Sequence, residues 1–171
     1  MRYLFYHGQV SPAGVRNVES LLTQALQEGD PAIVLCLASG GGDVNAGVGL
    51  YNFIQMLPMK VHTHAAGLCA SIAVTILLAG EKRTAAPVSA FSTHAATFSE
   101  GPEKGQISPN TKLISQPFAE TLGWDEETLA ARFGSNEFRF GPDDALTFGL
   151  IDEVVLIRIG TEDRILPVHI P

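Results

Sequence analysis

The chain has 171 residues, of which 46% are hydrophobic and 17% charged, and eleven Lys and Arg against eighteen Asp and Glu give a net charge of −7. This composition excludes intrinsic disorder, and the length suits one domain. Because phosphate contacts need clustered Lys and Arg, an acidic chain without a basic run is also excluded as a nucleic-acid binder. The low share of charge predicts that other subunits cover some of the apolar surface.

Strand-like and helix-like segments alternate along the first half of the chain. Residues 2–7 are expected to form a strand, after which Ser11 and Pro12 begin a helix that Gly29 ends. The next elements are expected to be a buried strand at 32–37, a tight loop at 39–42, a helix from about 43 to 57, and a strand at 60–65.

The second half is expected to hold shorter elements. Strands are expected near 84–85 and at 88–94, a polar loop rich in Gly and Pro at 95–109, helices at 109–122, 125–132 and 142–148, and closing strands at 151–157 and 164–168. Strands that alternate with crossover helices imply an α/β fold with a mainly parallel sheet. Ligands of such folds collect at the carboxyl ends of the strands.

Residues 65–80 carry no charge and invite comparison with a membrane span. The segment has sixteen residues, fewer than the roughly twenty that cross a bilayer, so we expect a fully buried core helix. The N-terminus is too short and too aromatic for a signal peptide. Cys36 and Cys69 lie inside apolar runs, as buried reduced thiols do. We therefore expect a cytoplasmic protein without a membrane span.

Ser71 lies at the start of the uncharged helix. A serine there has its hydroxyl beside free backbone N–H groups and the positive end of the helix dipole. Such a site can attack a carbonyl and hold the resulting oxyanion. The alternative is an N-cap serine that only begins the helix.

Residues 40–42 are three glycines, which let the backbone pass close to a ligand and aim N–H groups at it. A phosphate cradle is the competing interpretation. It fails because no Lys-Ser or Lys-Thr pair follows and because Asp43 would repel phosphate.

His94 ends a strand-like run, where it is either a hydrogen-bonded structural residue or a catalytic base. His62 and His64 lie two apart on a strand and so share a face, but without a third ligand at sensible spacing we expect no metal site. A catalytic histidine needs an acid to orient it. The candidates are Glu137, Asp143, Asp144 and Asp152, and spacing alone does not choose among them.

Four segments of the chain resemble the Clp-type serine peptidases. Residues 38–47 resemble that family's Ser-Pro-Gly-Gly segment and the helix after it, and residues 67–73 resemble its Gly-x-x-Ala-Ser nucleophile turn. Residues 79–94 resemble the stretch that leads to the family's histidine, and residues 145–154 resemble its closing helix and strand.

The resemblance implies a Clp-protease or crotonase-like fold, with repeated strand-strand-helix units around a mainly parallel sheet. It also implies peptide-bond hydrolysis through an acyl-enzyme without a cofactor. Carried over by position, Ser71 would be the nucleophile, His94 the general base, and the N–H groups of Gly41 and Ile72 the oxyanion hole. Glu137 falls where the family has its aspartate, with Asn136 as a neighbouring alternative.

The chain departs from the family pattern at several points. Gly40 replaces the family's proline, and two alanines follow His94 in place of Gln-Pro. Residues 95–135 form a variable loop and helical arm of the single domain 1–171, shorter than in the family. The family's N-terminal pore loops are not expected, so coupling to an ATP-driven unfoldase would be lost, with peptides or unfolded chains as substrates.

A homo-oligomer, in the family a ring, is expected from the resemblance. Aromatic residues gather in the variable stretch, where they form either ordinary core or a subunit interface: Phe98, Phe118, Trp124, Phe133, Phe138, Phe140 and Phe148. Two rival functions remain open. One is a catalytically inactive Clp-like assembly subunit, and the other is a crotonase-type enzyme that acts on acyl thioesters with a two-amide oxyanion hole.

Overall fold

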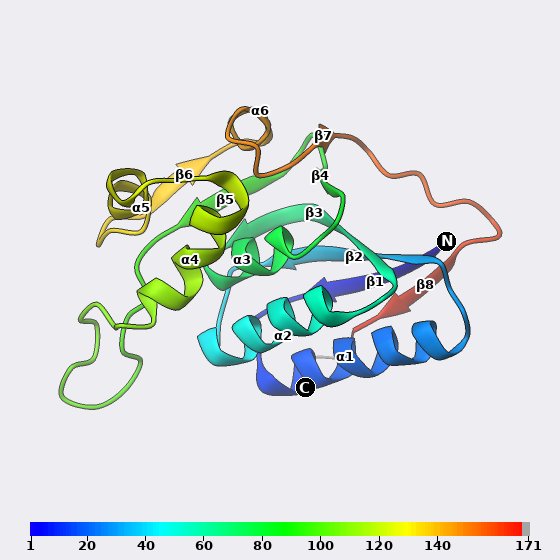
Figure 1. Ribbon diagram of the computed structural model, residues 1–171, viewed down its shortest axis with the longest axis horizontal. Coiled ribbons are helices and arrows are strands. Elements are labelled where there is room, and N and C mark those ends of the chain that lie inside the picture. Colours follow the sequence, from blue (N-terminus) through cyan, green and yellow to red (C-terminus); the bar gives the residue numbers. More distant parts are fainter. Residues whose placement is uncertain (169–171) are drawn as a thin grey trace.

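A computed structural model describes residues 1–168 of the chain (Figure 1). The strands are β1 (Arg2–His7), β2 (Ala32–Ser39), β3 (Lys60–Ala70), β4 (Arg83–Ala85), β5 (Ala90–Thr93), β6 (Phe138–Phe140), β7 (Glu153–Val154) and β8 (Arg164–Pro167). The helices are α1 (Pro12–Gln27), α2 (Val44–Met56), α3 (Ile72–Leu78), α4 (Thr111–Leu122), α5 (Glu126–Arg132) and α6 (Pro142–Thr147).

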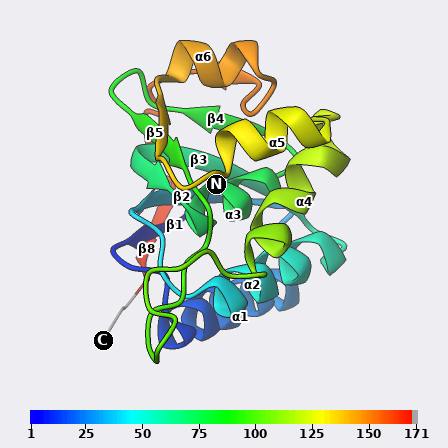
Figure 2. The same cartoon turned by 90° about the vertical axis from the view of Figure 1, so that its left-hand side faces the viewer.

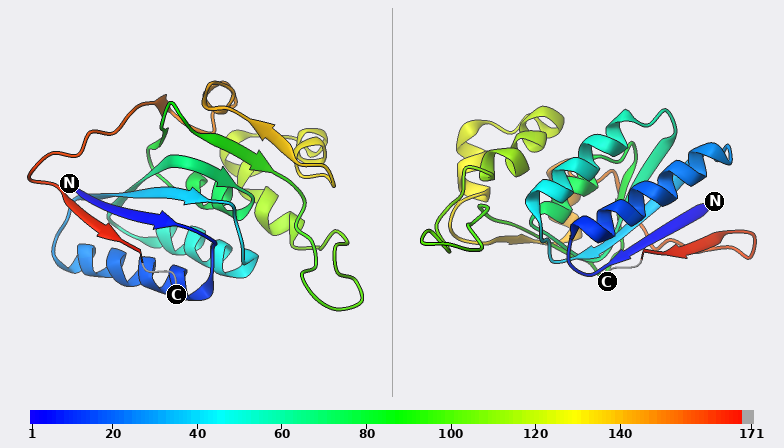
Figure 3. Two further views of the ribbon diagram at one scale, coloured as in Figure 1. Left: turned by 180° about the vertical axis from the view of Figure 1, so that it is seen from behind. Right: turned by 90° about the horizontal axis from the view of Figure 1, so that it is seen from below.

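The strands form one sheet in the order β6-β5-β3-β2-β1-β8; off this path, β4 pairs with β3, and β7 pairs with β4. All pairs are parallel except β5 with β6, which is antiparallel. Helices α1, α2 and α3 pack on the same face of the sheet, as the view from below shows (Figure 3). Figure 2 shows α5 between α4 and α6, at the end of the molecule that carries β5 and β6. The predicted mainly parallel α/β sheet is confirmed.

Strand β3 connects two parts of the sheet, because it is long enough to pair with different neighbours along its length. Its residues 63–65 pair with β4, and residues 68–70 pair with β5. Both pairings are parallel, so β3 and β5 deliver their carboxyl ends to the same edge of the sheet. The residues that follow Ala70 and Thr93 therefore meet there.

The predicted core helix over residues 65–80 is wrong in its first part. Residues 65–70 continue β3, and α3 spans only Ile72–Leu78, all of it buried. The reason is that an uncharged run satisfies a buried strand as well as a buried helix, and pairing of Leu68 with Ala90 decides in favour of the strand. The short antiparallel strand β6 was not predicted, and β7 has two residues where a longer strand was expected.

Both thiols are free and buried, as predicted from the apolar runs around them. Burial raises the pKa of the Cys36 thiol to about 12, so it stays protonated and unreactive at neutral pH. Across residues 1–168, no helix combines the length and apolarity needed to span a membrane.

The aromatic side chains of the variable stretch pack against one another inside the chain. Contacts link all of them except Phe98 into one cluster, which Phe91 of β5 joins through Phe140 at 5.3 Å between ring centroids. Phe118 and Phe133 are buried in the main core. These contacts show core packing within the chain, while Trp124, Phe138 and Phe148 remain partly exposed.

His64 makes the stability of the fold depend on pH. Its side chain is 4% exposed, its Nδ1 lies 2.8 Å from the Thr84 hydroxyl, and burial lowers its pKa from 6.5 to about 4. Between these two pH values the unfolded chain binds a proton at His64 that the folded chain does not, so stability falls as the pH falls.

We predict that replacing His64 with Gln removes this part of the acid sensitivity. Between pH 7.5 and pH 4 the wild-type chain should lose on the order of 3 kcal/mol more unfolding free energy than the variant. Urea denaturation of both proteins across this range measures the difference. Parallel stability curves for the two proteins would contradict the prediction.

Candidate active site

Ser71 connects β3 to α3 in a strained backbone conformation. Its φ of 56° and ψ of −131° make it the one non-glycine residue with positive φ among residues 1–168. Such conformations cost about 1–3 kcal/mol and persist only where the surroundings enforce them. The Ser71 N–H donates to the Ser92 carbonyl at 2.8 Å, and its own carbonyl accepts the Val74 N–H at 3.0 Å.

The Ser71 hydroxyl does not cap the helix that it precedes. An N-cap serine has ordinary extended dihedrals and accepts an N–H bond from the first turn, and Ser71 does neither. The strand-turn-helix geometry instead matches the sharp elbow on which hydrolases present a nucleophile.

The glycine loop lies directly against this elbow. Gly41 has a φ of +97°, and a Cβ there would stand 2.7 Å from the Ser71 Cβ and 3.0 Å from the Ala70 carbonyl oxygen. The loop is held in place by Val10, whose N–H donates to the Gly41 carbonyl at 2.8 Å and whose carbonyl accepts the Asp43 N–H at 2.9 Å. Only a glycine fits at position 41.

The two N–H groups predicted as oxyanion donors differ in their hydrogen bonding. The Ile72 N–H is the first of helix α3, where no intrahelical acceptor exists. The Gly41 N–H donates to the Ser39 hydroxyl at 3.1 Å. An oxyanion at this site would therefore have to replace the Ser39 oxygen as the acceptor for Gly41. Ser39 was not predicted as a site residue. Its position directly before the three glycines does not by itself indicate a bond to the Gly41 N–H.

His94 follows the last residue of β5. Because Ala70 pairs with Ser92, Ser71 and His94 leave neighbouring parallel strands, which lie about 4.8 Å apart. The His94 Nδ1 lies 2.7 Å from the Ala95 carbonyl oxygen, which can only accept a hydrogen bond. A protonated Nδ1 leaves Nε2 of the neutral ring free to accept a proton.

Glu137 is bonded elsewhere than to His94. Its carboxylate pairs with the guanidinium of Arg139 at 2.6 Å. Arg139 is the main cause that lowers the Glu137 pKa, with smaller contributions from the Ser92 hydroxyl and from the charge of His94. Glu137 lies next to His94 across the antiparallel pair of β5 and β6, because Thr93 pairs with Phe138, although its hydrogen bond goes to Arg139.

The other candidate acids have different surroundings. Asp152 binds the backbone N–H and the side chain of Arg83. Asp143 and Asp144 are exposed in the first turn of α6, and Asn136 is exposed next to Glu137. Among residues 1–168, no group of three His, Cys, Asp or Glu side chains is placed to hold a metal ion, and no third such side chain joins His62 and His64.

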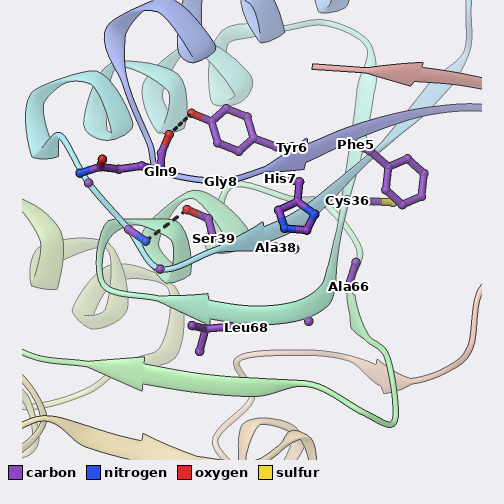
Figure 4. A pocket seen from close by; sticks show the side chains of 14 residues that line it. Phe5, Tyr6, His7, Gly8, Gln9, Cys36, Ala38, Ser39, Ala66 and Leu68 are labelled. Atoms are coloured by element: carbon purple, nitrogen blue, oxygen red, sulfur yellow. Dashed lines mark hydrogen bonds between the residues drawn. The ribbon is translucent and has the colours of Figure 1, made fainter. Parts of the chain in front are cut away.

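A cleft of about 790 Å³ opens beside the glycine loop, residues 40–42 (Figure 4). Its walls come from the carboxyl halves of β1, β2 and β3, with the aromatic ring of Phe5, the imidazole of His7 and the half-exposed side chain of Leu68 among them. Gly41, which packs against Ser71, lines this cleft, whereas Ser71 itself is not among the lining residues.

Comparisons with known proteins concern the family and the fold of the chain. The sequence model of the family described as Clp protease matches residues 1–158. An ATP-dependent Clp protease proteolytic subunit from Bdellovibrio bacteriovorus is 28% identical over 153 residues, covering 82% of this chain and 72% of that protein. A point mutant of ClpP1 from Listeria monocytogenes superposes with a TM-score of 0.82 at 23% identity, covering 92% of both chains.

We predict that Gly41→Ala destabilises the chain by at least about 2 kcal/mol, because the positive φ and the contact with Ser71 both penalise a Cβ. Gly40→Ala is the matched control, since nothing lies within 4 Å of its Cβ position. Urea denaturation at neutral pH measures both variants. Equal stability of the two would show that the loop does not press on Ser71.

Proposed function

The chain belongs to the Clp protease family and is a protease, and we propose that it cleaves peptide bonds through an acyl-enzyme on Ser71. The observation that carries this proposal is the strained elbow of Ser71 packed against Gly41. A serine with no chemical role would relax to an unstrained conformation, whereas an exposed nucleophile needs the sharp turn.

His94 acts as the general base in this proposal. Its Nε2 takes the proton of the Ser71 hydroxyl as Oγ attacks the scissile carbonyl carbon. The bond from Nδ1 to the Ala95 carbonyl keeps the ring in the tautomer that can accept this proton. His94 then gives the proton to the leaving amine, and water repeats the sequence on the acyl-enzyme.

The Gly41 and Ile72 amides stabilise the tetrahedral oxyanion. Removing one such donor costs about 2.7–4 kcal/mol in other hydrolases. For Gly41 this requires its N–H to turn from the Ser39 hydroxyl to the oxyanion.

Glu137 is proposed as the acid that stabilises the imidazolium of His94. Its place next to His94 across the antiparallel pair of β5 and β6, in which Thr93 pairs with Phe138, supports this role. Asn136, the neighbouring alternative, carries no charge and cannot supply such stabilisation.

We further propose that the protein works as a homo-oligomer in the cytoplasm, on peptides or unfolded chains. Exposed apolar side chains on the strands and loops of the sheet support an assembly: Leu68, Val88, Leu156 and Ile165. The Bdellovibrio relative is named as the proteolytic subunit of an ATP-dependent protease, which makes an ATP-driven unfoldase the partner class to test. Native mass spectrometry distinguishes a monomer from an assembly.

We predict that a fluorophosphonate probe labels Ser71 and that His94→Ala abolishes most of this labelling. Peptide mapping by mass spectrometry identifies the modified residue, and Ser71→Ala provides the unlabelled control with an intact fold. A folded wild-type protein that stays unlabelled at neutral pH would favour the inactive assembly subunit. Thioester binding without labelling would favour the crotonase-type enzyme.

We predict that Glu137→Gln slows labelling of Ser71 about tenfold or more without lowering the melting temperature by more than a few degrees, because it removes a charge and leaves the shape. Asn136→Ala is the matched control. An unchanged rate in Glu137→Gln together with a slow Asn136→Ala would contradict the assignment.

A further inference from the structure

Arg132, the last residue of α5, has its guanidinium enclosed by aromatic rings. The Cζ atom lies 4.0 Å from the centroid of Phe148, 4.1 Å from that of Trp124 and 5.2 Å from that of Phe138. Its Nη1 is buried without a hydrogen-bond partner, and no carboxylate pairs with it among residues 1–168. The rings therefore supply the interaction that holds this charge.

The three rings come from different parts of the chain. Trp124 lies in the link between α4 and α5, Phe138 begins β6, and Phe148 ends α6. We call these three rings the aromatic cage. A cation between them ties α5 to β6 and α6, whereas α5 itself has no buried residue. The end of α5 is therefore placed by the cage, by Phe133, which packs against Phe118, and by Leu129, which packs against the main core.

The segment that Arg132 begins holds His94 from both sides. The Thr93 hydroxyl donates to the Arg132 carbonyl at 2.7 Å, and the Ala95 N–H donates to the Gly134 carbonyl at 2.8 Å. Thr93 is completely buried and Ala95 nearly so. Both chain neighbours of His94 are thus hydrogen-bonded to residues 132–134.

We propose that Arg132 is a positioning residue for His94, which it places by holding residues 132–134 through the aromatic cage. Arg132 itself does not touch the reacting atoms. The inference rests on the proposed role of His94 as the general base. When the cage loses its cation, the end of α5 moves, the two bonds beside His94 weaken, and the imidazole leaves its productive place beside Ser71.

Arg132→Met tests the proposal, because it keeps the length of the side chain and removes the charge. The rate of Ser71 modification by a fluorophosphonate at saturating probe should fall about 10- to 100-fold, as small misplacements of catalytic groups do. The concentration for half-maximal rate should stay unchanged. Arg132→Lys should keep most of the rate, since an ammonium also binds aromatic rings. Arg16→Met, at an exposed position on α1, is the control expected to react like the wild type.

Two further variants separate positioning from general destabilisation. Thr93→Val breaks one bond of the pair without changing the shape, so its effect and that of Arg132→Met should combine to less than the product of the two. In Arg132→Ala, millimolar guanidinium chloride should restore part of the rate by entering the cage, and sodium chloride at the same ionic strength should not.

The possible outcomes distinguish this inference from the proposed function. If wild-type Ser71 is labelled and Arg132→Met reacts at the wild-type rate, the positioning role is wrong and the peptidase mechanism stands. Effects of Arg132→Met and Thr93→Val that multiply fully would also overturn it. If wild-type Ser71 is never labelled, the NMR signals of the His94 ring decide: a shift in Arg132→Met supports the placement of His94 by Arg132, and unchanged signals overturn it.

Discussion

The close approach of two backbone turns organises this site. The glycine loop after β2 and the elbow after β3 meet so tightly that Gly41 has no room for a Cβ, and Ser71 adopts a backbone conformation that its side chain disfavours. Packing of Val10 on one side and pairing of β3 with β5 on the other keep the two turns together. These backbone bonds therefore hold Ser71 in its strained conformation. The conformation places Ser71 next to the glycine loop and at the start of α3.

The backbone contributes to this site as much as the side chains do. The Ala95 carbonyl oxygen lies 2.7 Å from the His94 Nδ1 and orients the imidazole, while Glu137 forms an ion pair with Arg139. A hydroxyl, that of Ser39, accepts the N–H that the oxyanion would need. In the proposed mechanism, a substrate therefore competes with Ser39 for one of the two donors.

The sequence could predict which residues reach the site but only part of how they meet. Ser71, His94 and Gly41 follow apolar strands, so parallel topology alone brings them to one edge. The length of α3 could not be predicted, because the uncharged residues before Ser71 fit a buried strand equally well. The bond between Thr93 and Arg132 could not be predicted either, since it joins segments distant in sequence. The bonds of Ser39 to Gly41 and of His94 to the Ala95 carbonyl are local, but each depends on a side-chain orientation that the sequence pattern does not give. The family resemblance placed Glu137 near His94, but its pairing with Arg139 required the antiparallel strand β6, which the sequence pattern does not signal.

The central claim is that the strained elbow and the glycine loop together form an oxyanion site. A crystal structure after reaction with a peptide boronate tests it most directly, because boron forms a tetrahedral adduct with a nucleophilic serine. The account predicts a bond from boron to the Ser71 Oγ, with one boronate oxygen about 2.7–3.1 Å from the Gly41 and Ile72 nitrogens and Gly41 released from Ser39. An adduct whose oxygens face solvent while Gly41 still donates to Ser39, or no adduct on Ser71, would contradict it.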